Sequence, residues 1–146
     1  MPTRTARTAW NGGLQDGSGQ VELTSSKAGT FDVDFPKRAS DSPEGQTSPE
    51  ELVAAAHAAC FAMSLANEVG QAGGTPHGIE VSAEVELGPD DKNGGFTLTG
   101  IRLTGSVEAE GLDDAGFVQA VDAAEAGCPV SKALAAVAIS VDISRA

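Results

Sequence analysis

Apolar and polar residues alternate in three short runs within the first 35 residues, and glycine and serine separate these runs. The clearest two are VELTS at 21–25 and FDVDF at 31–35. Such alternation places apolar side chains on one face of a β-strand and polar ones on the other. We therefore predict antiparallel strands within residues 3–35, with one face toward water, followed by a polar loop at 36–47.

The segment from Pro49 to Gln71 has the pattern of one long helix that is apolar on most of its sides. Ser48 is a favourable N-cap, Pro49 suits the first helical position, and Glu51 stands where a capping box requires an acid. A helix that is apolar nearly all round is normally buried. Its many alanines also let another helix approach closely. We predict the central helix of the fold, suited to pack against its own copy in a dimer.

Strand and helix patterns alternate through the second half of the chain. Two alternating runs, 78–88 and 96–110, flank the turn DDKNGG and predict a hairpin. Helical segments are predicted at 113–126, ended by a left-handed Gly127, and at 129–135, before a last strand at 138–144. The prediction is one α+β domain over residues 1–146, with antiparallel sheets around a long buried central helix.

Composition and charge exclude several classes of function. The chain has 146 residues and a net charge of −12, which argues against binding to nucleic acid or an anionic membrane, since both need a basic face. The N-terminus has no apolar signal segment, and no uninterrupted apolar run approaches the ~18 residues of a transmembrane helix. We therefore expect a cytoplasmic protein that binds neither membranes nor nucleic acid.

The chain contains only two cysteines, Cys60 and Cys128. In a reducing compartment a permanent disulfide is not expected, which leaves catalysis, redox sensing or simple burial. Cys60 lies in the middle of the apolar helix, as a core residue or as a nucleophile activated by charges from elsewhere. Cys128 lies between Gly127 and Pro129, at the predicted start of a helix, where the helix dipole lowers the pKa of a thiol. By position alone, Cys128 is predicted to be the more acidic thiol.

A metal site is a second interpretation of the same residues. His57 and Cys60 are three residues apart on one helix, and Cys128 with a carboxylate would complete a set of ligands. Two ligands on one helix are too few for a closed zinc site. The simpler interpretation of His57 is a histidine that packs between helices.

Two motifs resemble the OsmC/Ohr superfamily, the osmotically inducible protein C and organic hydroperoxide resistance proteins. They are SPEELVAAAHAACFAMSLANEVGQAG at 48–73 and AGCPVSKAL at 126–134. His57 within HAACF, together with the CPVS form of the second motif, resembles the OsmC branch. The resemblance implies an intertwined homodimer with active sites at the subunit interface. The implied activity is that of a thiol-dependent peroxidase for organic hydroperoxides and hydrogen peroxide.

The resemblance also implies roles for individual residues. Cys60 corresponds to the peroxidatic cysteine and Cys128 to the resolving cysteine, which reverses the order of acidity suggested by position. Glu50 corresponds to the glutamate of the family, and we assign the arginine to Arg38, with Arg7 as the weaker option. The early glycine-rich turn WNGGLQDG lacks the arginine of Ohr-type members. No metal, flavin or haem is implied.

The implied cycle oxidises Cys60 to a sulfenic acid, which Cys128 resolves as an intramolecular disulfide. An external dithiol, such as a lipoylated protein in this family, then reduces the disulfide. Glu50 and Cys60 are ten residues apart on one helix, a rise of about 15 Å, so we predict that the Glu50 serving a given Cys60 comes from the other subunit. The alternative functions are a non-catalytic redox sensor or a small-molecule-binding module of the same fold.

Overall fold

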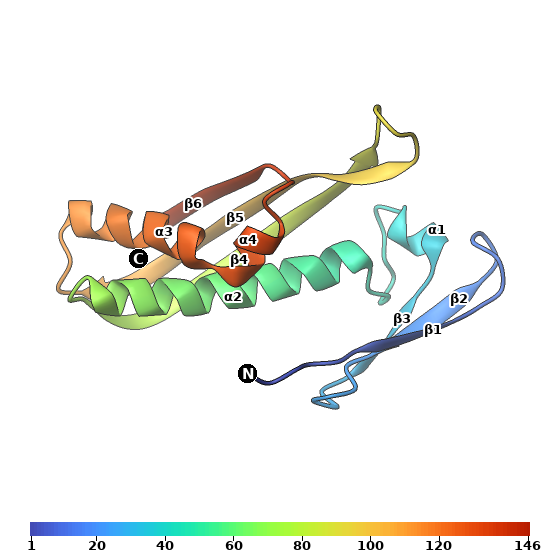
Figure 1. Cartoon of the computed structure of the whole chain (residues 1–146), viewed down its shortest axis with the longest axis horizontal. Helices are drawn as coiled ribbons and strands as arrows, with labels where there is room; N and C mark the ends of the chain where they lie inside the picture. Colours follow the sequence, from blue (N-terminus) through green and yellow to red (C-terminus); the bar gives the residue numbers. More distant parts are fainter. The chain divides into compact units, whose positions relative to one another are not determined.

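The computed structural model describes all 146 residues, which form two compact units, Met1–Leu52 and Val53–Ala146 (Figure 1). The first unit contains one antiparallel sheet in the order β1-β2-β3. Its strands are β1 (Arg7–Asn11), β2 (Ser18–Glu22) and β3 (Thr30–Val33). The alternating pattern correctly predicted antiparallel strands in this region, but β2 ends at Glu22, so most of the run at 21–25 lies outside it.

A short helix, α1 (Phe35–Arg38), occupies the start of the segment that we predicted as a loop. Asp34 caps this helix, because its carboxylate accepts the Lys37 N–H at 2.6 Å. Pro36 stands in the first turn, where its missing N–H costs nothing. The loop prediction was wrong for these residues. The cap residue Asp34 did not indicate a helix in the sequence, because it also fits the end of the preceding strand.

The long helix α2 (Pro49–Gln71) has the predicted bounds. Ser48 acts as its N-cap, with the Ser48 Oγ accepting the Glu51 N–H at 3.1 Å. The Glu51 carboxylate accepts the Thr47 hydroxyl at 2.6 Å. The acidic residue of the predicted capping box therefore stabilises the residue before the cap.

Within this chain α2 is buried along one stripe, and the predicted packing of its other sides against a second copy stays a prediction. His57, Phe61, Leu65 and Val69 recur at every fourth position and are fully buried, whereas Met63 is 71% exposed. Much of the remaining helix surface is alanine, together with the exposed Met63.

By length and composition alone, α2 meets the criterion for a membrane span, with a mean hydropathy of 1.4 over an 18-residue window. The expectation from uninterrupted apolar runs missed this, because small and weakly polar residues are spread between the apolar ones. A core helix of a soluble protein meets the same criterion, and α2 contributes Phe61, Leu65 and Val69 to the core cluster.

The second unit contains a three-stranded sheet in the order β4-β5-β6. The long strands β4 (Thr75–Pro89) and β5 (Phe96–Glu110) form the predicted antiparallel hairpin. The last strand, β6 (Ile139–Arg145), pairs parallel to β5, which corrects our prediction of purely antiparallel sheets. Two helices, α3 (Asp114–Gly127) and α4 (Pro129–Ala133), form the crossover that a parallel pair requires.

The core of this unit lies between the sheet and the helices that cover one of its faces (Figure 1). Its buried members are contributed by α2, α3, β5 and Cys128: Phe61, Leu65, Val69, Leu103, Val107, Phe117, Ala120, Ala124 and Cys128. Cys128 thus belongs to the core, at the junction of α3 and α4.

That junction differs from the prediction. Gly127 is the last residue of α3 and does not adopt a left-handed conformation. Cys128 is extended, with φ −61° and ψ 118°, because the ring of Pro129 excludes the helical conformation from the preceding residue. The proline therefore separates the two helices and leaves Cys128 at the start of α4.

Candidate functional site

The two cysteines lie side by side in the second unit. The Sγ atoms of Cys60 on α2 and Cys128 at the start of α4 are 3.0 Å apart. Cys128 is fully buried, Cys60 is half-buried, and both are free thiols. The sulfurs are about 1 Å further apart than in a disulfide, so a small shift of one side chain would join them.

The environment separates the acidities of the two thiols. Burial raises the pKa of Cys60, and its hydrogen bond with Cys128 raises that pKa further. Burial opposes ionisation of Cys128 too, but donors from Cys60, from the backbone and hydroxyl of Ser131 and from the backbone of Val130 lower its pKa. In the hydrogen bond between the two sulfurs, the Cys128 S–H donates to Cys60. Within this unit, Cys128 is the more acidic thiol.

Next to the thiols, a second buried pair joins the same two helices. His57 Nε2 lies 2.8 Å from Ser131 Oγ. His57 is fully buried and Ser131 is 6% exposed. Burial lowers the pKa of His57, which keeps the imidazole neutral. Our sequence analysis did not select Ser131, although the residue stands within the CPVS motif, three positions after Cys128.

In the first unit, Arg38 and Glu50 form a forked ion pair. Arg38 Nη2 lies 2.7 Å from Glu50 Oε1, and Arg38 Nε lies 3.2 and 3.1 Å from the two carboxylate oxygens. The side chains are 31% and 11% exposed, respectively. Burial opposes ionisation of Glu50, but its ion pair with Arg38 and its hydrogen bonds with the backbone and with Ser48 together lower the pKa of the carboxyl group.

Arg7, the second candidate arginine, lies elsewhere in this unit. Its Nη2 is 3.5 Å from Glu22 Oε2, and its side chain is 71% exposed. A pair of this exposure contributes little to stability or to orientation. Arg38 is thus the candidate arginine that is held in place by a carboxylate.

A pocket of about 390 Å³ in the first unit has Arg38 in its wall. Apolar side chains provide most of the remaining lining, among them Trp10, Leu14, Val21, Val33, Phe35 and Leu52. This volume falls in the range of small-molecule sites, and one cation in an apolar wall suits a ligand with an apolar body and a polar end. Phe61, the neighbour of Cys60 on α2, belongs to the core and does not line this pocket.

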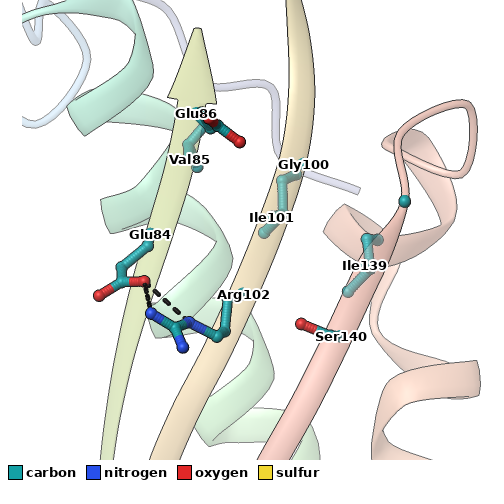
Figure 2. Close-up of a pocket in the computed structure, with 9 residues that line it drawn as sticks. Glu84, Val85, Glu86, Gly100, Ile101, Arg102, Ile139 and Ser140 are labelled. Carbon is teal, nitrogen blue, oxygen red and sulfur yellow. Dashed lines mark hydrogen bonds and ion pairs between the residues drawn. The ribbon is translucent and has the colours of Figure 1, made fainter.

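A larger cavity, of about 670 Å³, lies on the sheet of the second unit. Figure 2 shows Arg102 on β5 directed toward Glu84 on β4. The two side chains form an ion pair with a separation of 2.6 Å. Both side chains are more than half exposed. Neither thiol lines this cavity, so we place no chemistry there.

No group of three or more histidine, cysteine, aspartate or glutamate side chains is arranged to hold a metal ion. His57 directs its Nε2 to Ser131 instead of toward the thiols. The set His57, Cys60 and Cys128, which we considered as metal ligands, therefore does not form a ligand cluster.

The fold and the paired thiols define a class: a mixed α+β protein with two small sheets, a long central helix and two facing cysteines. The family model described as "OsmC-like protein" matches residues 41–144, a range that includes Glu50 and both cysteines but not Arg38. The chain belongs to this OsmC-like family, within the OsmC/Ohr superfamily that its motifs resemble.

Named relatives and solved structures agree with this assignment. The chain is 40% identical over 127 residues to "Peroxiredoxin OsmC" of Escherichia coli (strain K12), covering 87% of this chain and 86% of the relative. It is 35% identical over 103 residues to "Organic hydroperoxide resistance protein OhrB" of Bacillus subtilis (strain 168), covering 70% and 72%.

Among crystal structures, an organic hydroperoxide resistance protein OsmC from Legionella pneumophila superposes with a TM-score of 0.78 at 27% identity, covering 99% of this chain and 98% of the other. A structure of an organic hydroperoxide resistance protein from Elizabethkingia anophelis gives a TM-score of 0.80 at 25% identity, covering 100% and 98%. The two sheets and the central helix are therefore the architecture of this superfamily.

Proposed function

We propose that this protein is a thiol-dependent peroxidase that reduces organic hydroperoxides, and hydrogen peroxide less readily. The observation that carries the proposal is the 3.0 Å separation of the Cys60 and Cys128 sulfurs in a largely buried site. The names of the relatives, a peroxiredoxin and an organic hydroperoxide resistance protein, support the same activity. Two adjacent thiols are what a cycle through a sulfenic acid and a disulfide requires.

In the proposed cycle, the Cys60 thiolate attacks the distal oxygen of the hydroperoxide, and the alcohol leaves. Cys60 becomes a sulfenic acid, and the Cys128 sulfur attacks it to form the disulfide and release water. An external dithiol, such as a lipoyl group, then reduces the disulfide. No resident cofactor takes part in these steps.

Cys60 needs a cation to become the attacking thiolate, because within its own unit its pKa is raised. A guanidinium in contact with the sulfur would supply this charge. We assign that role to Arg38, which Glu50 orients through the forked pair.

We further propose that the Arg38–Glu50 pair serves Cys60 of a second subunit. Glu50 and Cys60 are ten residues apart on α2, about 15 Å along the axis, which is too far for one arginine to bridge. Only 22% of the apolar window of α2 is buried inside the chain. A homodimer in which two α2 helices pack antiparallel would cover this surface and bring each pair to the opposite thiol.

The pocket beside Arg38 supports an organic substrate. Its apolar lining suits an alkyl or aryl group, while the guanidinium faces the polar end of the ligand. Hydrogen peroxide has no group that this lining could bind.

Free thiols and a dithiol reductant require a reducing compartment, so we place the protein in the cytoplasm.

The test is consumption of cumene hydroperoxide and of hydrogen peroxide with a dithiol reductant, for the wild type and for Cys60→Ser and Cys128→Ser. We expect repeated turnover in the wild type, no reaction in Cys60→Ser, and a stop after one oxidation in Cys128→Ser. A wild type that is oxidised once without turnover would instead indicate a redox sensor. Loss of the first oxidation in Cys128→Ser alone would reverse the two roles.

A further inference from the structure

Trp10 forms part of the wall of the pocket that also contains Arg38. It lies on β1 in the first unit and is 41% exposed. Trp10 is the only tryptophan of the chain, which has no tyrosine. A large part of its indole ring is therefore accessible at the pocket, and its fluorescence reports on that site alone.

The polar edge of this indole is already bonded to the protein. Trp10 Nε1 donates to the carbonyl oxygen of Gly12 at 3.0 Å. Gly12 has a φ of +89°, a left-handed conformation that glycine adopts readily. Nε1–H is the only hydrogen-bonding group of the tryptophan side chain. What the ring offers to a ligand is therefore its aromatic surface.

A glycine on the neighbouring strand makes room for the ring. Gly19 on β2 pairs with Trp10 across the sheet. A Cβ atom on Gly19 would lie 2.9 Å from Trp10 Cε3 and 2.5 Å from the backbone oxygen of Ala9. The ring thus packs against bare backbone at Gly19. The hydrogen bond to Gly12 and this packing hold the indole in one orientation before any ligand arrives, which reduces the entropy lost on binding.

The charged groups of the lining are engaged by the protein itself. Asp34 accepts the Lys37 N–H at 2.6 Å as the cap of α1, and Arg38 is paired with Glu50. The guanidinium has more N–H donors than this pair uses, so it can also bind the polar end of a ligand. The body of the ligand is left to Trp10 and the apolar side chains around it.

We propose that Trp10 is a specificity-determining residue of this pocket, which selects ligands with an aryl group over ligands with a saturated body of the same size. An aromatic ring packs against an indole in offset or edge-to-face geometry, and this adds to the effect of buried area. The substrate class is then the aryl hydroperoxides. Only the reacting group rests on the proposed function, because neither cysteine lines this pocket.

A saturated analogue separates aromatic recognition from simple burial. Cumyl alcohol, the product of cumene hydroperoxide, and its ring-saturated analogue have the same carbon skeleton. The saturated ring has at least as much apolar surface, so burial alone would favour it or treat the two alike. A preference for the aryl compound therefore has the opposite sign from that expected of a plain apolar wall.

The first experiment is a fluorescence titration of the wild type with these two alcohols, which do not oxidise thiols. We expect both to change the Trp10 emission and the aryl alcohol to have a Kd about 2- to 10-fold lower. Equal affinities, or tighter binding of the saturated alcohol, would overturn the proposal. So would an emission that neither alcohol changes up to its solubility.

Substitutions then assign the preference to the ring, with binding measured by calorimetry. Trp10→Leu should abolish the preference for the aryl alcohol, whereas Trp10→Phe should retain part of it. The control is Phe31→Leu, because Phe31 is 39% exposed on β3 of the same sheet but does not line the pocket. A preference that persists in Trp10→Leu would overturn the proposal. If Trp10→Leu does not fold, the titration of the wild type still decides.

Kinetics separate this inference from the peroxidase proposal. With cumene hydroperoxide and its ring-saturated analogue, Trp10→Leu should lower the ratio of the two kcat/KM values by the same 2- to 10-fold, about what one aromatic contact contributes. The rate with hydrogen peroxide should not change. Selective binding of the aryl alcohol without peroxide turnover would reject the peroxidase only. Turnover with equal binding of the two alcohols would reject the inference only.

Discussion

The sulfurs of Cys60 and Cys128 lie 3.0 Å apart although 68 residues separate them in the chain. A disulfide between them would close a loop of that length, and in the chain-entropy model such a loop stabilises the folded state by about 4 kcal/mol. We therefore expect a mild oxidant to raise the free energy of unfolding by up to this amount, measured by urea denaturation. Cys128→Ser should show no effect of oxidant. Equal stability of the reduced and oxidised wild type would contradict the prediction.

The Arg38–Glu50 pair should stabilise the protein in a pH-dependent manner. The pKa of Glu50 is lowered from 4.5 in the folded state, so its contribution is present above pH 4.5 and is lost as the pH falls through the lower folded-state pKa. We expect Glu50→Gln to cost about 1–2 kcal/mol at pH 7 and progressively less in acid. The control is Glu84→Gln, which breaks the exposed pair with Arg102 and should change stability by less than about 1 kcal/mol. Equal effects of the two substitutions would show that the forked pair adds nothing.

Mixed dimers test whether the site is shared between subunits. An Arg38→Ala chain retains Cys60, and a Cys60→Ser chain retains Arg38, so each homodimer should be inactive. If the two groups come from different subunits, the mixed dimer has one complete site and should regain peroxidase activity. Differently tagged chains, expressed together and purified by both tags, provide this species. An inactive mixed dimer would place both groups in one chain.

The pocket beside Arg38 should control the choice of peroxide. Leu14 lines this pocket and is 59% exposed, so Leu14→Glu should fold normally while adding a charge to the apolar wall. We expect a higher KM for cumene hydroperoxide and little change for hydrogen peroxide. Val118→Glu is the control, because Val118 is 56% exposed on α3 and lies outside this pocket. A parallel loss with both peroxides would argue against the pocket as the substrate site.

His57 should make stability fall in mild acid. Burial lowers its folded-state pKa below 6.5, so below that pH the unfolded chain binds a proton that the folded chain does not. Stability from this residue is complete above about pH 6.5 and decreases below it, by at most about 1.4 kcal/mol per pH unit. His57→Gln should remove this slope between pH 5 and 7, as measured by urea denaturation. A slope that persists in the variant would have to come from another group.

Local patterns predicted most of the secondary structure. Alternation located the strands of both sheets, and Ser48 with Pro49 located the start of α2, because these signals depend on neighbours in the chain. Two features depend on more than the local pattern. The direction of β6 depends on how the crossover through α3 and α4 folds back onto the sheet, and the burial of α2 depends on what covers its alanines.

Within the candidate site, the sequence by itself determined the types of residue and the family to which their motifs belong. Cys60, Cys128, Glu50 and Arg38 were selected from their motifs and positions. Only the tertiary structure decided which of them meet: it joined the two thiols across 68 residues, paired Arg38 with Glu50, and left Arg7 on a strand at the surface.

The structure alone also selected Ser131, which has no chemistry of its own in the sequence. Its hydroxyl is buried and lies 2.8 Å from Nε2 of the buried His57. Those conditions arise from the packing of α2 against α4, and helix packing depends on contacts between residues distant in the chain. The sequence therefore specified the candidate reactive groups, and the fold determined which residues lie beside them.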